Sequence, residues 1–220
     1  KVMDFNFVEL ATQAMLDGTI PTQMPSMFEL ENIGVKASQF SFSRLSKADP
    51  ILGVDMASTG EVGCIGPDYY DAILKSMLSV GYRIPKKSIL ISSGPIRSKI
   101  ELLSSTQMLQ DKGYKIYGTR GTAKFLSENG VEIEAVAWPD EKGERTALDL
   151  IRSKEVDFVI NIPKNLSENE LFNDYQIRRA AIDLNVPLVT NARLASAFIY
   201  SFCKKTQETL DINTYSHYLS

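Results

Sequence analysis

The chain has 220 residues, of which 44% are hydrophobic and 23% charged, the ordinary balance of a globular protein with one or two domains. Its 24 basic and 27 acidic residues give a formal net charge of −3, which predicts no nucleic-acid partner, and no apolar run is long enough to span a membrane. The two cysteines, Cys64 and Cys203, fit neither a disulfide framework nor a zinc site, so we expect a protein of the reducing cytoplasm.

The start of the chain has a helical pattern. Apolar residues recur at helical spacing from Phe7 to Met15, and Gly18 follows where that helix would stop. The chain begins at Lys1, without a methionine, and enters this pattern almost at once. We interpret this as a segment of a longer protein.

The next segment, 19–56, is rich in proline, methionine and strand-forming residues, and short strands are expected at 34–36, 39–43 and 51–56. A second helix is expected over 67–80, opened by Pro67 and closed by Gly81. Residues 81–87 are short, basic and interrupted by a proline, which predicts a linker.

After this linker the pattern changes to alternating strands and helices. Strand-like runs occur at 88–92, 115–119, 133–138, 158–162 and 187–190. Helical runs occur at 97–112, 120–129, 145–154, 174–185 and 192–205. This alternation predicts an α/β fold, a Rossmann-like five-stranded parallel sheet flanked by helices.

Ligands of such sheets bind beyond the carboxyl ends of the strands. Almost every predicted strand there is followed by a hydroxyl, an amide or a lysine: Ser92, Ser93, Gly94 and Lys99; Thr119 to Thr122; Trp138 to Asp140; Asn161, Pro163, Lys164 and Asn165; Thr190 and Asn191. The sequence therefore predicts a polar binding site at this edge.

The Thr119-Arg120-Gly121-Thr122 turn runs straight into a helix and is the most specific of these features. Free N–H groups of the helix and the two hydroxyls would bind a phosphate or carboxylate. Alternatively, the threonines only cap the helix. Lys99, Arg178 and Arg179 add positive charge, although two adjacent arginines on a helix also fit a solvated surface.

No catalytic residue and no metal site are predicted. The single histidine, His217, lies near the end of the chain, which leaves no Ser–His or Cys–His pair. Asp140, Glu141 and Glu144 fit a solvated polar loop. Trp138, the single tryptophan, would either wall a ligand pocket or fill the core.

Five motifs in order along the chain resemble carbamoyl-phosphate synthase large subunits. The motifs are Val35 to Leu45, Leu52 to Val62 (with Asp55 where the family has glutamate), Thr119 to Thr122, Asn161 to Pro163, and Ile177 to Arg179. The first two resemble the end of the second ATP-grasp unit, and the other three resemble the regulatory domain that closes those proteins. The resemblance covers essentially all 220 residues.

The resemblance implies two parts, an α+β ATP-grasp tail at 1–84 and a methylglyoxal-synthase-like allosteric domain at 85–220. The parent would be a ligase that makes carbamoyl phosphate for arginine and pyrimidine synthesis from bicarbonate, glutamine-derived ammonia and ATP. It would need ATP with Mg or Mn, and a glutaminase small subunit as partner. The family's metal-binding Glu-x-Asn-x-Arg segment does not occur in this sequence. This part alone is therefore expected to be inactive and to contain no cofactor.

The resemblance also implies a small anionic effector and, through residues 50–87, a link to the catalytic unit. The expected effector-binding residues are Ser93, Lys99, Thr119, Thr122, Trp138, Asn161, Lys164, Arg178, Arg179 and Thr190. Thr190 matches a position that contacts ornithine in bacterial members. Trp138, followed by proline, resembles the N-acetylglutamate-dependent members, whereas Lys164 and Asp174 stand where those have asparagine. We expect an N-acetylglutamate-like ligand ahead of UMP or IMP.

Two other interpretations start from the same fold. One is a methylglyoxal synthase acting on dihydroxyacetone phosphate, but 138–144 lacks the Gly-Gly-Asp motif of those enzymes. The other is a ligand sensor with no ligase partner, for which the ATP-grasp tail would have no use.

Overall fold

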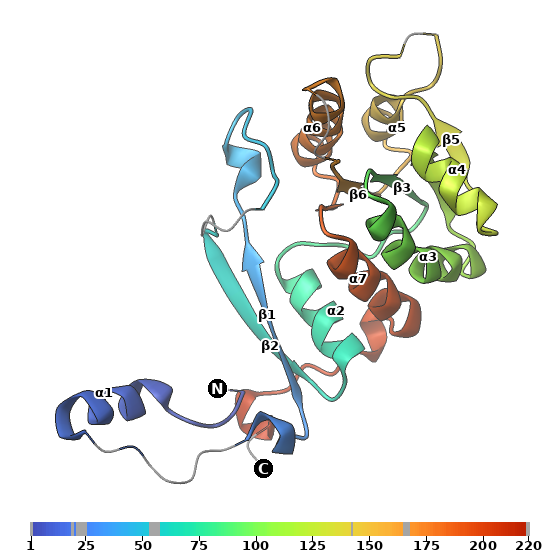
Figure 1. The fold of residues 1–220 in the computed structure, drawn as a ribbon. Coiled ribbons are helices and arrows are strands. Elements are labelled where there is room, and N and C mark those ends of the chain that lie inside the picture. Colours follow the sequence, from blue (N-terminus) through green and yellow to red (C-terminus); the bar gives the residue numbers. More distant parts are fainter. Residues whose placement is uncertain are drawn as a thin grey trace.

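A computed structural model describes residues 2–18, 20, 26–52, 58–141, 143–164 and 168–218 (Figure 1). Its helices are α1 Phe7–Asp17, α2 Tyr69–Ser79, α3 Ile96–Asp111, α4 Arg120–Glu128, α5 Ala147–Arg152, α6 Glu168–Asp183 and α7 Ala192–Lys204. Its strands are β1 Ile33–Gln39, β2 Gly60–Gly66, β3 Ser88–Ser93, β4 Lys115–Thr119, β5 Glu134–Val136, β6 Phe158–Ile162 and β7 Leu188–Val189. Short 3-10 helices lie at Met27–Glu29, Phe42–Arg44, Gln207–Thr209 and Tyr215–Tyr218.

The predicted five-stranded parallel sheet is confirmed, in the order β5-β4-β3-β6-β7. Side chains of the central strands alternate between its two faces. Ile89 and Ile91 join a core with α3, α4 and α7, whereas Leu90 joins a second core with α5 and α6. Because successive apolar side chains of a strand point to opposite faces, both faces of the sheet must be covered by helices.

Most predicted boundaries lie within two residues of the observed ones, and α6 is the exception. It begins at Glu168 rather than near residue 174. Leu171 and Phe172 in its first turns are exposed. The start of a helix is predicted from apolar residues buried at helical spacing, and these two residues do not provide that signal.

The second helix, α2, shares the core of the sheet. Its Ile73, Leu74 and Met77 belong to the same cluster as the α7 residues Phe198 and Phe202. Asp68 caps its N-terminus by accepting the N–H of Asp71. The helix expected to belong to the first segment therefore packs with the second, and the division at residue 84 stays a prediction.

The predicted linker at 81–87 is bound to the sheet along its length. The Tyr82 hydroxyl donates to the Leu188 carbonyl at 2.8 Å, and the Asp157 carboxylate accepts the backbone N–H groups of Lys86 and Lys87. This segment therefore fixes α2 against β6 and β7.

The first segment forms an antiparallel hairpin of β1 and β2. The strand predicted at 39–43 is wrong, because β1 ends at Gln39 and Phe42–Arg44 is a 3-10 helix. The prediction at 51–56 falls mostly on residues 53–57, which lie outside the described residues. The strand β2 was not predicted.

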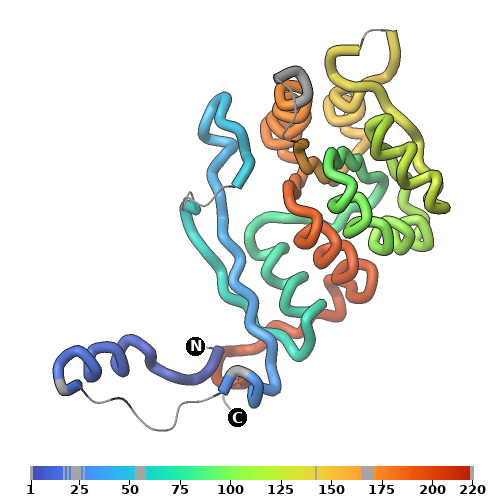
Figure 2. The backbone as a smooth tube through the Cα atoms, in the orientation of Figure 1, coloured from blue at the N-terminus to red at the C-terminus, as the bar shows by residue number. Residues whose placement is uncertain are grey.

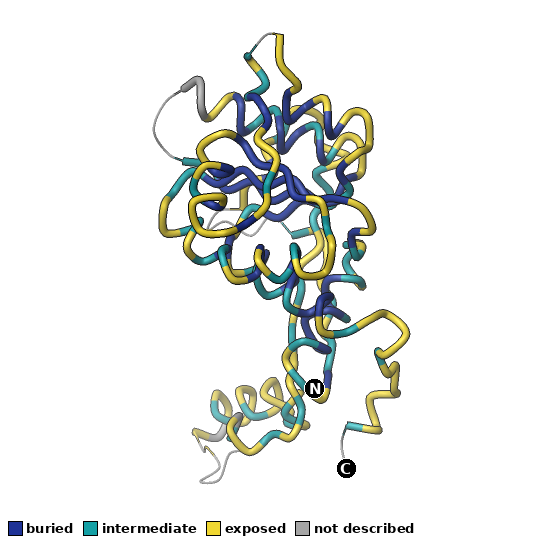
Figure 3. Tube along the Cα trace, turned by 90° about the vertical axis from the view of Figure 1, so that its right-hand side faces the viewer, coloured by how far each residue is buried: buried dark blue, intermediate teal, exposed yellow. Residues whose placement is uncertain are grey.

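Helix α1 lies apart from the sheet, near both chain ends (Figure 2). Gly18 ends it in the left-handed conformation, as expected. Buried residues gather at the sheet, whereas α1 is largely exposed (Figure 3). Within the described ranges, no helix combines the length and apolar character needed to cross a bilayer. Cys64 and Cys203 are free thiols.

Candidate functional site

Four hydroxyl side chains meet where β3 and β4 end. We call Ser92, Ser93, Thr119 and Thr122 the hydroxyl cluster, and each of them is at most 4% exposed. The Thr119 hydroxyl donates to the Ser92 hydroxyl at 3.2 Å and lies 3.4 Å from the Thr122 hydroxyl. Adjacent parallel strands bring their carboxyl ends together, so residues 26 or more positions apart become neighbours.

The alternative role of the two threonines, capping helix α4 with their side chains, is not observed. Thr119 occupies the N-cap position, but its side chain makes no capping hydrogen bond. Thr122 instead accepts the Ser93 N–H at 2.9 Å and donates to the Ser93 carbonyl. The Ser93 hydroxyl oxygen is buried and has no hydrogen-bond partner. A buried polar atom without a partner is uncommon, and a bound ligand would satisfy it.

Two half-buried lysines lie beside this cluster. Lys99 donates to the Gly121 carbonyl at 3.0 Å. Burial, and then the positive charge of Lys164, lower the pKa of Lys99 below its ordinary value. Within the part of the chain that the structure describes, neither lysine forms an ion pair.

Gly94 allows Lys164 to reach this position. A Cβ atom at Gly94 would lie 2.1 Å from Cβ and 2.8 Å from Cα of Lys164. Both distances are far inside van der Waals contact. The absence of a side chain at position 94 thus lets Lys164, which follows β6, lie close to the β3–α3 turn.

Asn161 and Asp174 extend the polar network under the cluster. Asp174 accepts from the Ser92 hydroxyl at 3.4 Å and from Asn161 Nδ2 at 2.7 Å. Asn161 Oδ1 in turn accepts from Arg178 at 2.8 Å. All four side chains are buried.

The two arginines do not point into the hydroxyl cluster. Arg178 is 1% exposed and forms a two-pronged ion pair with Asp49, at 2.7 and 2.6 Å. Arg179 donates to the carbonyls of Phe42, Leu45 and Ala48 and pairs with Asp183. Both guanidinium groups hold the segment 42–49. The structure therefore shows them neither at the hydroxyl cluster nor on a solvated surface.

Trp138 and Thr190 lie towards opposite edges of the sheet. Trp138 follows β5, is half-buried and packs against the α5–α6 core. Thr190 follows β7 and lines a cavity of about 580 Å³ between the 38–52 segment and the start of α7. Four strand spacings of ~4.8 Å separate β5 from β7, roughly 19 Å. The ten predicted residues therefore do not form one site.

The acidic loop after Trp138 is tied down rather than freely solvated. Arg120 pairs with Glu141 at 3.1 Å and with Glu144 at 2.7 Å, and Asn173 donates to Asp140 at 2.8 Å. The bond with Glu144, followed by the negative charges of both glutamates, raises the pKa of Arg120. The loop borders the β4 end of the site, and no periodic pattern of residues indicates these ion pairs.

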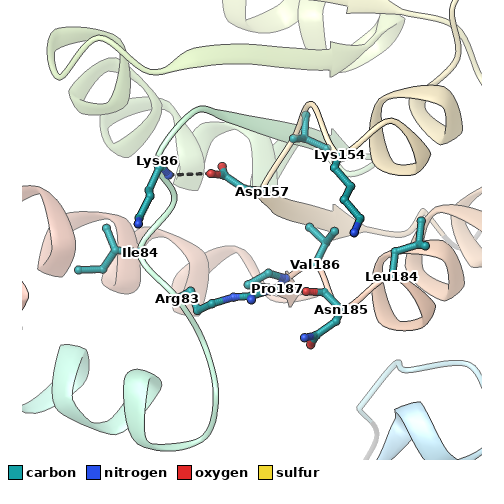
Figure 4. A pocket seen from close by; sticks show the side chains of 10 residues that line it. Arg83, Ile84, Lys86, Lys154, Asp157, Leu184, Asn185, Val186 and Pro187 are labelled. Atoms are coloured by element: carbon teal, nitrogen blue, oxygen red, sulfur yellow. Dashed lines mark hydrogen bonds between the residues drawn. The ribbon is translucent and has the colours of Figure 1, made fainter.

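A second cavity, of about 500 Å³, opens at the amino ends of the strands (Figure 4). Arg83, Lys86 and Lys154 line it together with apolar residues. No residue of the hydroxyl cluster lines either cavity. Among the described residues, no group of histidine, cysteine and acidic side chains could hold a metal ion.

The sequence of the chain is similar to known proteins. Residues 101–190 match the family described as MGS-like domain. The chain is 40% identical over 222 residues to the multifunctional protein URA2 of Saccharomyces cerevisiae, which aligns with 97% of this chain. It is 36% identical over 228 residues to the mitochondrial carbamoyl-phosphate synthase [ammonia] of Homo sapiens, which aligns with 99% of it.

The chain spans only 10% of the yeast protein and 15% of the human one. Among solved structures, a methylglyoxal synthase from Elizabethkingia anophelis superposes with a TM-score of 0.38 and 16% identity. The match covers 62% of this chain and 93% of that one.

Proposed function

We propose that this chain, which contains an MGS-like domain and is related over more than nine-tenths of its length to carbamoyl-phosphate synthases, is the effector-binding regulatory segment of such an enzyme. The observation that carries the proposal is the hydroxyl cluster beside two lysines that form no ion pair with any described residue. The Ser93 hydroxyl has no hydrogen-bond partner among the residues that the structure describes, and a ligand oxygen would supply one.

A small anion is the ligand class that this arrangement favours. Lys99 and Lys164 supply positive charge, and the first-turn N–H groups of α4 are not capped by Thr119. An N-acetylglutamate-like ligand is preferred to UMP or IMP, because Trp138 followed by proline resembles the family members that depend on N-acetylglutamate. Thr190 lies in the separate cavity beside the 38–52 segment, so an ornithine-like ligand would bind there.

The parent protein would synthesise carbamoyl phosphate for the pyrimidine and arginine pathways. ATP with Mg or Mn, and a glutaminase partner, would act in parts of the parent outside these 220 residues. The chain itself is proposed to have no turnover, since the Glu-x-Asn-x-Arg segment that holds the metal ions and ATP phosphates in that family does not occur in its sequence. Carbamoyl phosphate formation or ATP hydrolysis above blank by this chain would contradict that.

Calorimetric titration tests the effector site. We expect N-acetylglutamate, UMP or IMP to bind, and Thr119→Val to weaken binding about 10-fold, the cost of one hydrogen bond to a charged group. Lys99→Ala should weaken it at least as much. Lys124→Ala is the control, because Lys124 is an exposed lysine on α4 that pairs with Glu128.

Two results would overturn the proposal. One is that none of these ligands binds the wild-type chain. The other is that Thr119→Val and Lys124→Ala bind equally well. Methylglyoxal formation from dihydroxyacetone phosphate would favour the enzyme interpretation instead, although 138–144 lacks the required pair of glycines.

A further inference from the structure

We propose that a chain of buried hydrogen bonds carries the state of the hydroxyl cluster to the segment 42–49. This rests on the proposed function, because the cluster is the effector site. The side chains of this relay are, in order, Thr119, Ser92, Asp174, Asn161, Arg178 and Asp49.

The relay is tight at one end and loose at the other. From Asp174 to Asp49 every bond is between 2.6 and 2.8 Å, and most of them involve a charged partner. From Asp174 back to Thr119 the bonds are 3.4 and 3.2 Å. Short bonds between charged partners are about twice as strong as neutral ones. A perturbation therefore enters at the hydroxyl end, where the bonds yield most easily.

At the hydroxyl end of the relay, the protons of Thr119 and Ser92 both point towards Asp174. An ionised Asp174 carboxylate can only accept, so the Ser92 hydroxyl gives its single proton to Asp174. Ser92 must then accept the proton of Thr119. Without a ligand, Thr119 consequently presents lone pairs, and not a donor, to the space beyond the cluster.

An anion that binds Thr119 reverses this order. To donate to a ligand oxygen, the Thr119 hydroxyl must turn away from Ser92, which leaves the Ser92 oxygen without its donor. Ser92 and Asp174 then readjust, because a buried polar atom left unpaired costs about 1–3 kcal/mol. Ligand binding and the position of Asp174 are thereby linked.

The Asn161 amide links Asp174 to Arg178 and can take only one orientation between them. Its Nδ2 donates to the Asp174 carboxylate, and its Oδ1 accepts from the Arg178 guanidinium. Turning the amide over would place its oxygen against the carboxylate and its NH₂ against the guanidinium, both repulsive. The amide therefore moves as one piece with both neighbours.

The far end of the relay lies on a segment that α6 holds by three side chains. Besides Arg178 and Arg179, the Tyr175 hydroxyl donates to the Lys47 carbonyl at 2.9 Å. The segment has few bonds of its own, among them Leu45 N–H to Phe42 O and Ala48 N–H to Leu45 O. The segment follows β1 on the way to β2, so a shift of Asp49 would be passed on to the hairpin of these two strands.

A ligand-free experiment tests the relay by itself. In the full-length parent, we expect Ser92→Ala to speed amide deuterium exchange in a peptide spanning 42–49 by about threefold or more, through easier local opening. Ser105→Ala is the matched control, since Ser105 is equally buried and hydrogen-bonded but lies in α3 outside the relay. Equal exchange in both variants, or no change in Ser92→Ala, would overturn the relay.

A second experiment uses N-acetylglutamate and UMP as probes. Asp49→Asn should leave probe affinity in the parent within about twofold, yet reduce the change that the probe causes in 42–49 exchange about fivefold. Tyr175→Phe loosens the same segment without touching the relay and should keep that change.

The outcomes separate the two proposals. Equal loss in Asp49→Asn and Tyr175→Phe would mean general loosening and would refute the relay. If neither probe binds the wild-type parent, the effector site fails, while the Ser92→Ala result still decides the relay.

Discussion

Lys99 combines two properties that make it the most informative residue of the site. It donates to the Gly121 carbonyl beside the hydroxyl cluster, and burial together with the charge of Lys164 lowers its pKa. A lysine with a lowered pKa loses its proton at a lower pH than a free one does. Its charge state can therefore be followed through ligand binding.

We expect effector binding to weaken as the pH rises. A bound anion favours the protonated lysine and raises its pKa again, so binding takes up protons in the range where free Lys99 is losing them. Affinity should therefore begin to fall at a pH below 10.5, the ordinary pKa of lysine. Titration calorimetry in two buffers of different ionisation enthalpy measures both effects.

Lys99→Arg provides the control for that experiment. Arginine stays charged over this range, so the pH dependence should flatten even if affinity changes. A wild-type affinity that does not vary with pH would contradict the assignment.

Gly94 is the residue at which a single methyl group should do most damage. Gly94→Ala would place a Cβ atom 2.1 Å from Lys164 Cβ and 2.8 Å from its Cα, which backbone movement alone can relieve. We expect a loss of about 1–3 kcal/mol in the free energy of unfolding, measured in urea, and weaker effector binding. Gly63→Ala in β2, where a Cβ meets nothing within 4 Å, should cost far less.

At the scale of elements, α6 connects the polar network under the hydroxyl cluster with the segment 42–49. One of its sides faces the sheet through Ile177 and Ala181, and its polar side chains reach both Asn161 and the segment 42–49. A helix is rigid along its axis, so side chains one turn apart move together. This is why Asp174 and Arg178, four residues apart, can couple two distant places.

Helix α2 depends on a cap that also ties it to α7. Asp68 accepts the N–H of Asp71 at 2.9 Å and pairs with Lys205, just beyond α7, at 2.7 Å. The hydrogen bond from Lys205 is the main reason why the pKa of Asp68 lies below its ordinary value. We expect Asp68→Ala to reduce the free energy of unfolding by about 1 kcal/mol, as loss of a helix cap does.

The pH dependence of that loss follows from the lowered pKa. The stabilisation by Asp68 is complete above its ordinary pKa of 3.8 and is lost as the pH falls below it. Asp68→Asn keeps a capping oxygen and loses the charge, so it should cost less than Asp68→Ala at neutral pH. Equal stabilities of the two variants would contradict the cap.

At the scale of the whole molecule, stability should decline in alkali. Burial raises the pKa of Tyr82 to about 12 and that of the Cys203 thiol to about 11. Both groups ionise more easily in the unfolded chain, which therefore gains stability relative to the fold as the pH rises. The stabilisation is complete below the ordinary pKa values, 9.0 for the thiol and 10.0 for the tyrosine, and is lost above them.

Tyr82→Phe separates the tyrosine from the thiol. The variant loses the hydrogen bond to Leu188, so its unfolding free energy at neutral pH should fall by about 1 kcal/mol. Above about pH 10 its stability should decline less steeply than that of the wild type. Urea denaturation at several pH values measures this, and Tyr69→Phe, at an exposed tyrosine, should follow the wild type.

The sequence by itself determined the sheet and the edge at which its polar residues gather. Buried strands and amphipathic helices have periods that local sequence reveals, and β4 and β6 have the predicted bounds. Parallel strands all end at one edge, so the positions of Ser93, Thr119 and Asn161 followed from the strands alone. The effector identity and the role of each residue stay predictions.

Only the tertiary structure decided what the charged residues do. Arg178 finds Asp49 at a separation of 129 residues, and Arg179 finds three carbonyls of the same distant segment. No periodic pattern in the sequence predicts such partners, because they result from how the segment 42–49 packs on α6. For the same reason Asp174 could be noticed in the sequence as a departure from a family pattern, but only packing could place it between Ser92 and Asn161.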